Sequence, residues 1–124
     1  MTSRIRQWTI DVHDLDVMAE FWSQALGYQV DKGGDGSAKL FSGQPGDPTV
    51  WLQPTAGAKR DKNRTHPDLN VTDGDVDTEV DRLLGLGARH ADVGQTGEEG
   101  FVVLADPEGN EFCLLYGPPS KYVG

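Results

Sequence analysis

The sequence contains two copies of one strand–helix pattern, and this repeat limits the possible folds more than any other feature. Residues 7–12 alternate between polar and apolar side chains, and residues 66–71 do the same. Such alternation is typical of a strand with one buried face. Each copy continues into a helical pattern that ends on Leu-Gly, at Gly27 in the first copy and at Gly87 in the second. The chain is therefore predicted to be built from two similar modules.

Three short strands are expected after each helix, so that each module has the order βαβββ. In the first module they are expected at residues 28–31, 38–42 and 49–53, and in the second at residues 88–93, 101–105 and 111–116. Asp14 or Asp16 is expected to cap the first helix, and Asp73 or Asp75 the second. Residues 106–110 are predicted to form a tight turn, because Pro107 fixes φ and Gly109 accepts a positive φ.

A chain of 124 residues is expected to form one domain with a real core. Module one is predicted at about residues 4–54, a linker at 55–63, and module two at about 64–117. Each module alone would leave a sheet face and its edges bare. We therefore expect an α+β fold in which the two modules pair into one curved mixed sheet, with the helices outside and the polar faces meeting in a cleft.

Composition excludes several functional classes. The formal net charge is −9 and the pI is about 4.5, so no basic surface for nucleic acid or for an anionic membrane is expected. The single cysteine, Cys113, cannot form an intrachain disulfide, which fits a reducing compartment. No apolar segment is long enough for a signal peptide or a membrane span. A cytoplasmic location is therefore expected.

Four segments in order resemble the vicinal oxygen chelate superfamily: residues 12–15, 21–27, 63–69 and 106–112. This superfamily includes glyoxalase I, extradiol dioxygenases, and the bleomycin and fosfomycin resistance proteins. The resemblance spans residues 4–116, nearly the whole chain. It implies paired βαβββ modules, usually assembled as a homodimer, whose cleft often holds a divalent metal ion.

Metal enzymes of the superfamily place one ligand on the first strand and one on the last strand of each module. The resemblance puts the first-strand positions at Gln7 and His66, which stand 59 residues apart. The last-strand positions fall at or beside residues 51–53, where no carboxylate occurs, and at Cys113, where the superfamily has Glu. His66 is a good ligand and Gln7 a weak, tentative one, because divalent ions of this kind prefer carboxylate and imidazole ligands. An intact glyoxalase I type site is therefore not expected.

Two functional classes follow. In the first, the chain is a metal-free module that binds a small molecule, through ligand-binding positions predicted at Gln7, Phe41, Trp51, Gln53, Asn70 and Cys113. In the second, it is a lyase, isomerase or dioxygenase in which His66 helps to hold a Zn, Ni, Mn or Fe ion. Glu111 or Asp68 would then act as the catalytic base. The missing carboxylates favour the first class.

The sequence leaves other interpretations open at single residues. His66 is either a ligand or an imidazole held by Asp68 or by a backbone carbonyl. Trp51 either lines the cleft or belongs to a dimer interface. Cys113 is expected to be a buried, protonated thiol, and Trp8 and Trp22 are expected in the core.

Overall fold

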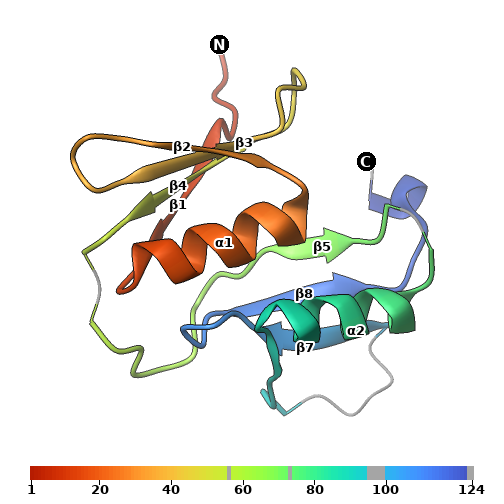
Figure 1. The fold of residues 1–124 in the computed structure, drawn as a ribbon. Coiled ribbons are helices and arrows are strands. Elements are labelled where there is room, and N and C mark those ends of the chain that lie inside the picture. Colours follow the sequence, from red (N-terminus) through yellow and green to blue (C-terminus); the bar gives the residue numbers. More distant parts are fainter. Residues whose placement is uncertain (56, 73, 95–99, 123–124) are drawn as a thin grey trace. The chain divides into compact units, whose positions relative to one another are not determined.

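The protein, seen here in a computed structural model, folds into two compact units (Figure 1). The structure describes residues 1–55, 57–72, 74–94 and 100–122. The first unit spans Met1–Lys59 and the second Arg60–Gly124, and each contains one α-helix and one mixed sheet of four strands. The predicted α+β class with two βαβββ modules is thereby confirmed. The pairing of the modules around a cleft stays a prediction.

Module one consists of one helix and four strands: β1 (Gln7–Asp11), α1 (Leu15–Leu26), β2 (Gln29–Lys32), β3 (Ala38–Phe41) and β4 (Thr49–Gln53). The strand order in its sheet is β1-β4-β3-β2. The first strand pairs with β4 in parallel, and the remaining pairs are antiparallel. The long connection from β1 to β4 through α1, β2 and β3 makes the parallel pair possible, because parallel strands cannot be joined by a tight turn.

The core of module one lies between α1 and one face of this sheet. Its buried side chains include Met18, Phe21 and Trp22 on the helix, and Ala38, Leu40, Val50 and Leu52 on the strands. Alternate residues of a strand point to opposite faces. The strand residues that alternate with these buried ones therefore point to the other face, which we call the polar face of module one.

Module two repeats the order with β5 (Asp68–Asn70), α2 (Val76–Leu86), β6 (Arg89–His90), β7 (Phe101–Ala105) and β8 (Glu111–Leu115). Its strand order is β5-β8-β7-β6, again with a parallel first pair. A short 3-10 helix, η1 (Pro119–Tyr122), follows and was not anticipated from the sequence. Among the described residues, no helix combines the length and the apolar character needed to cross a membrane.

Three expectations about local structure were wrong. Residues 66–71 were expected to form one strand, but β5 covers Asp68–Asn70 only, so His66 precedes the strand. Trp8 was expected in the core, but it is 42% exposed, whereas Trp22 is buried as predicted. Trp8 lies on β1, an edge strand, whereas α1 packs mainly on the central strands β3 and β4. Residues 88–93 were expected to form one strand, but β6 contains two residues only. Most of the predicted loop at 94–100 lies outside the described residues, as does Asp73, one of the two expected caps.

Both helices begin at an aspartate cap, as the repeat predicts. The Asp14 carboxylate accepts a hydrogen bond of 3.2 Å from the Val17 backbone N–H, and the Asp75 carboxylate one of 2.7 Å from Thr78. The first helix ends at Gly27, whose φ of 68° is the left-handed conformation that glycine adopts without strain. The helix boundaries are therefore set by local chemistry in both modules.

We expect Asp14→Ala and Asp75→Ala each to lower the free energy of unfolding by about 1 kcal/mol, because each removes the acceptor for a helix N-terminal N–H group. Urea denaturation followed by circular dichroism measures the change. The matched control is Asp81→Ala, at an exposed position within α2. Alanine favours helix more than aspartate does, so this control should be neutral or slightly stabilising. An equal loss in the control would contradict a capping role.

Candidate functional site

The register of β5 against β8 positions the candidate site of module two. Phe112 and Leu114 are almost fully buried on β8, the strand against which α2 packs. Cys113 lies between them and therefore points to the opposite face of the sheet. In the parallel pair of β5 and β8, Asp68 is the direct partner of Cys113. Residues paired in this way share a face, so the carboxylate and the thiol are neighbours.

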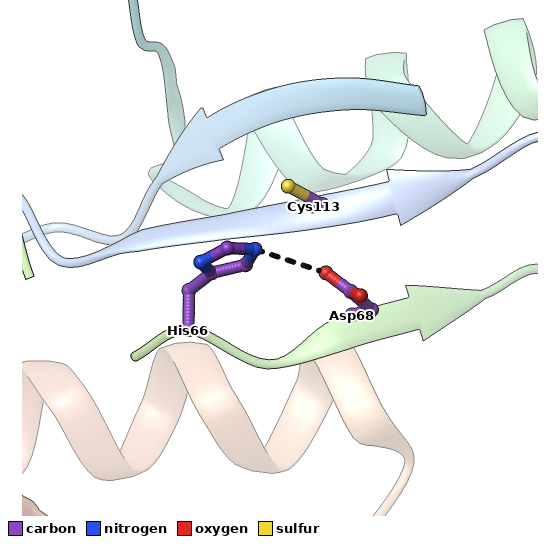
Figure 2. A group of neighbouring side chains, drawn as sticks. All are labelled: His66, Asp68 and Cys113. Atoms are coloured by element: carbon purple, nitrogen blue, oxygen red, sulfur yellow. Dashed lines mark ion pairs between the residues drawn. The ribbon is translucent and has the colours of Figure 1, made fainter. Parts of the chain in front are cut away.

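His66 joins these two residues to form the module-two group, defined as His66, Asp68 and Cys113. Its imidazole Nε2 lies 3.2 Å from Asp68 Oδ1, and Figure 2 shows the two side chains facing each other beside β8, which carries Cys113. One possible ligand atom from each residue lies within 4.8 Å of the others. The side chains of His66 and Asp68 are 36% and 50% exposed, whereas Cys113 is buried. The group therefore combines two accessible polar side chains with one enclosed thiol.

The Cys113 thiol is held in its neutral form. Burial raises its pKa from 9.0 to about 11, and the charge of Asp68 and a hydrogen bond to that carboxylate act in the same direction. The positive charge of Lys62 acts weakly in the opposite direction. At neutral pH the thiol therefore donates to Asp68 and is a poor nucleophile, because the thiolate is the reactive form.

The sequence left open whether His66 is a metal ligand or an imidazole held by Asp68 or by a backbone carbonyl, and the structure contains the contact with Asp68. The same carboxylate interacts with Cys113, so Asp68 lies between an imidazole and a thiol. The predicted roles of His66 as metal ligand and of Asp68 as base both remain predictions.

Glu111, the other predicted base, lies at the start of β8 on the same face as Cys113. It is buried, and its Oε2 accepts a hydrogen bond of 3.2 Å from the Asn63 backbone N–H. The Asn63 side chain donates in turn to Asn110 Oδ1 at 3.2 Å. Glu111 therefore fastens the segment that precedes His66 to β8. Sequence reasoning missed Asn63, although a buried carboxylate always requires such a partner.

Asn70 lies on the same face as Asp68, two residues along β5. Its Nδ2 donates to the Gly117 carbonyl at 2.9 Å. The Oδ1 atom is buried and has no hydrogen-bond partner among the described residues. A buried acceptor left without a donor costs about 1–3 kcal/mol. The ligand-binding role of Asn70 stays a prediction.

In module one, Trp51 occupies the position that corresponds to Cys113. It pairs with Thr9 on β1, as Cys113 pairs with Asp68 on β5. Its antiparallel partner on β3 is Lys39, so Trp51 lies between Thr9 and Lys39 in the sheet, on the polar face. Within the predicted range 51–53, the register therefore makes Trp51 the counterpart of Cys113.

The other candidates of module one share this polar face but make separate contacts. Phe41 lies two residues after Lys39, whose Nζ is 5.2 Å from the centre of the phenyl ring. Gln7 Oε1 accepts a hydrogen bond of 3.0 Å from Thr49 Oγ1, and Gln53 is exposed at the end of β4. The four predicted positions of module one are therefore on one face, as expected from strand alternation.

A separate cavity in module two was not anticipated from the sequence. It has a volume of about 390 Å³ and is lined by His90, Ala91, Asp92, Phe101, Val102, Val103 and Tyr116. No member of the module-two group contributes to its lining. Its residues come from β6, from β7 and from the chain after β8. No local sequence motif connects these segments, so the sequence alone did not indicate the cavity.

Comparisons with known proteins agree with this architecture. A family model described as a glyoxalase-like domain matches residues 7–115. No curated protein matches the sequence.

Three solved structures illustrate the similarity of fold. The fosfomycin resistance protein FosX from Mesorhizobium loti is 18% identical, with a TM-score of 0.72 over 98% of this chain and 97% of that one. A FosX mutant from Listeria monocytogenes, complexed with Mn(II) and 1S,2S-dihydroxypropylphosphonic acid, is 16% identical, with a TM-score of 0.74 over 98% and 95%. A glyoxalase/bleomycin resistance protein/dioxygenase family enzyme from Burkholderia phytofirmans is 19% identical, with a TM-score of 0.60 over 90% and 97%.

We expect alkylation of Cys113 by iodoacetamide to increase about tenfold for each pH unit up to about pH 10, because only the thiolate reacts. At pH 8 the thiolate fraction should be about 100-fold lower in the folded than in the unfolded chain, since two pKa units separate about 11 from 9.0. Mass spectrometry of timed samples measures the rate. A plateau above pH 9 in the folded protein would contradict the raised pKa.

The control for this experiment is Asp68→Asn, which removes the negative charge beside the thiol and keeps the shape of the side chain. The apparent pKa of Cys113 should move toward 9.0, but part of the shift should remain because burial is its largest cause. Restricted access would slow alkylation equally at every pH, so the pH profile separates access from ionisation.

Proposed function

Because the chain belongs to the glyoxalase-like family of the vicinal oxygen chelate superfamily, we propose that it binds a small organic molecule through the polar faces of its sheets. The neutral Cys113 thiol is the main observation in favour. It occupies the position at which the sequence resemblance places a glutamate. A carboxylate there would help to neutralise a divalent ion, whereas a thiol that donates to Asp68 offers no such charge. A glyoxalase I type metal site is therefore not part of this proposal.

The polar face of module one and the module-two group differ in the ligand chemistry that they support. In module one, Trp51 and Phe41 are partly exposed; the Lys39 ammonium group lies over the Phe41 ring, and Lys39 is the register partner of Trp51. Aromatic side chains in such a setting favour a planar or apolar group, and the cation favours an acidic one. In module two, His66 and Asp68 are accessible hydrogen-bonding groups. We therefore propose a ligand class of small, planar or apolar molecules that carry a polar substituent.

A metal-dependent family enzyme is the second candidate. The module-two group favours it, because His66 has two other possible ligands within 4.8 Å. A Zn, Ni, Mn or Fe ion there would supply Lewis-acid chemistry to a chelated substrate. Asp68 could not serve as both ligand and base, and the Glu111 carboxylate already accepts a hydrogen bond from the Asn63 backbone N–H. This arrangement of the two carboxylates makes the second candidate weaker than the first.

A thermal-shift screen of planar aromatic compounds, with and without acidic substituents, tests the first candidate. We expect some of them to raise the melting temperature, because a ligand that binds the folded state stabilises it. The variant Trp51→Ala should bind about tenfold more weakly, since loss of aromatic contact costs on the order of 1 kcal/mol. The same screen with added Mn(II) or Ni(II) tests the second candidate.

Trp8→Ala is the matched control. Trp8 has the same side chain and lies on the same sheet, but it pairs with the buried Val50 and so belongs to the opposite face. Ligand affinity should be unchanged in this variant. Equal losses in both variants, or no stabilising compound at all, would count against the proposed site. Stabilisation that requires Mn(II) or Ni(II) would favour the enzyme.

We also propose that the protein forms a homodimer. In each unit the first strand, β1 or β5, has a strand partner on one side only among the described residues. Exposed strand edges favour pairing with another chain. Light scattering at micromolar concentration should give twice the mass of 13.5 kDa, and a mass of one chain would contradict the proposal.

A further inference from the structure

Three chemically different donors meet within module two. They are the imidazole of His66, the carboxylate of Asp68 and the thiol of Cys113, and their ligand atoms lie within 4.8 Å of one another. Figure 2 shows that they come from two neighbouring segments, β5 with the residues before it and β8. Because the parallel register fixes Asp68 opposite Cys113, the backbone already positions two of the three donors.

The spacing is close to that of a tetrahedral metal site. Bonds of about 2.0–2.3 Å to zinc imply separations between ligand atoms of about 3.3–3.8 Å. The Nε2 of His66 and the Oδ1 of Asp68 are 3.2 Å apart. All ligand atoms of the group lie within 4.8 Å of one another, so a separation at that limit would have to shorten by about 1 Å. His66 and Asp68 are partly exposed and can adjust, whereas Cys113 is buried and provides the fixed point.

The donor set also selects the class of cation. Thiolate ligands favour zinc and other thiophilic ions, whereas Mg²⁺, Ca²⁺ and Mn²⁺ prefer carboxylate, carbonyl and water oxygens. One thiolate and one carboxylate would balance the charge of a divalent ion, and a neutral imidazole would complete the set. Three protein ligands leave one coordination position for water or for a ligand.

We propose that module two binds a thiophilic divalent cation of the zinc class through His66, Asp68 and Cys113, with a fourth position open. This site differs from a glyoxalase I type site, which would also draw on Gln7 and other residues of module one. The inference does not depend on the small-molecule function proposed above; it specifies the donors and the class of ion at the group that also favours the second candidate.

Binding involves no change of oxidation state. The Cys113 S–H bond breaks, its proton passes to solvent, and an Sγ–metal bond forms in its place. Asp68 exchanges the hydrogen bond from the thiol for a bond to the cation. The His66 imidazole exchanges its contact with Asp68 for a bond to the cation. The cation loses the water molecules that these three side chains replace.

Titration of the full chain with Cd(II) tests the site, because cadmium thiolates absorb in the near ultraviolet. Cys113 is the one cysteine of the sequence, so any thiolate band arises from this residue. We expect the band to saturate at one equivalent and to be absent in Cys113→Ser. Zinc should displace the cadmium and abolish the band, whereas Mn(II) in the same excess should not.

Variants of the other donors separate a built site from binding by the thiol alone. His66→Ala and Asp68→Asn should each weaken cadmium binding by roughly tenfold or more, since each removes a ligand. The matched control is His90→Ala, because His90 is an exposed histidine of the same module and lies outside the group. Gln7→Ala tests for the superfamily arrangement, in which a residue of module one would also hold the cation. Circular dichroism of every variant confirms that it is folded.

Absence of a saturable band in the wild-type chain would overturn the cation site. Equal affinity in the wild type, His66→Ala and Asp68→Asn would also overturn it, since it would reveal binding by the thiol alone. Loss of binding in Gln7→Ala would assign the cation to the superfamily arrangement instead. The small-molecule proposal is tested separately, by the thermal-shift screen on cation-free protein, so that either proposal can fail while the other stands.

Discussion

The parallel pairing of β5 with β8 is the constraint on which the candidate site depends. It places Asp68 opposite Cys113, and it includes a hydrogen bond of 3.0 Å from the Cys113 backbone N–H to the Pro67 carbonyl. A slip of one residue would turn Asp68 toward the helix side and would bring Leu69 opposite the thiol, because side chains alternate along a strand. Leu69 opposes such a slip, since it would lose its place beside the buried Leu114, its register partner.

Two buried carboxylates stabilise the end of this arrangement at which β8 begins. Asp106 is fully buried and accepts hydrogen bonds of 3.0 Å from the backbone N–H groups of Glu108 and Asn110, so it fixes the turn that leads into β8. Glu111, the first residue of β8, accepts a hydrogen bond from the Asn63 backbone N–H. Burying a charge without partners is costly, and the hydrogen bonds offset that cost. Through Asn63, this end of β8 is connected to the segment that precedes His66.

The chemistry of one side chain distinguishes the functional alternatives. Cys113 is neutral in the absence of a cation because burial and Asp68 both disfavour the thiolate. In that state the module-two face presents a hydrogen-bonded polar group suited to an organic ligand. A thiophilic ion would convert the same residue into an anionic ligand. The same side chains therefore support either ligand recognition or cation binding, and the difference lies in the protonation of a single sulfur atom.

The sequence by itself determined the repeat, the two modules, the aspartate caps and the alternation of polar and apolar faces. These features depend on residues near one another in the chain, whose conformational preferences act locally. The tertiary structure decided that Trp8 is exposed on an edge strand, that Asn63 satisfies Glu111, and that Asp68 and Cys113 meet across 45 residues of chain. Strand order and register produce these contacts, because they are set by packing and hydrogen bonding between distant segments rather than by any local pattern.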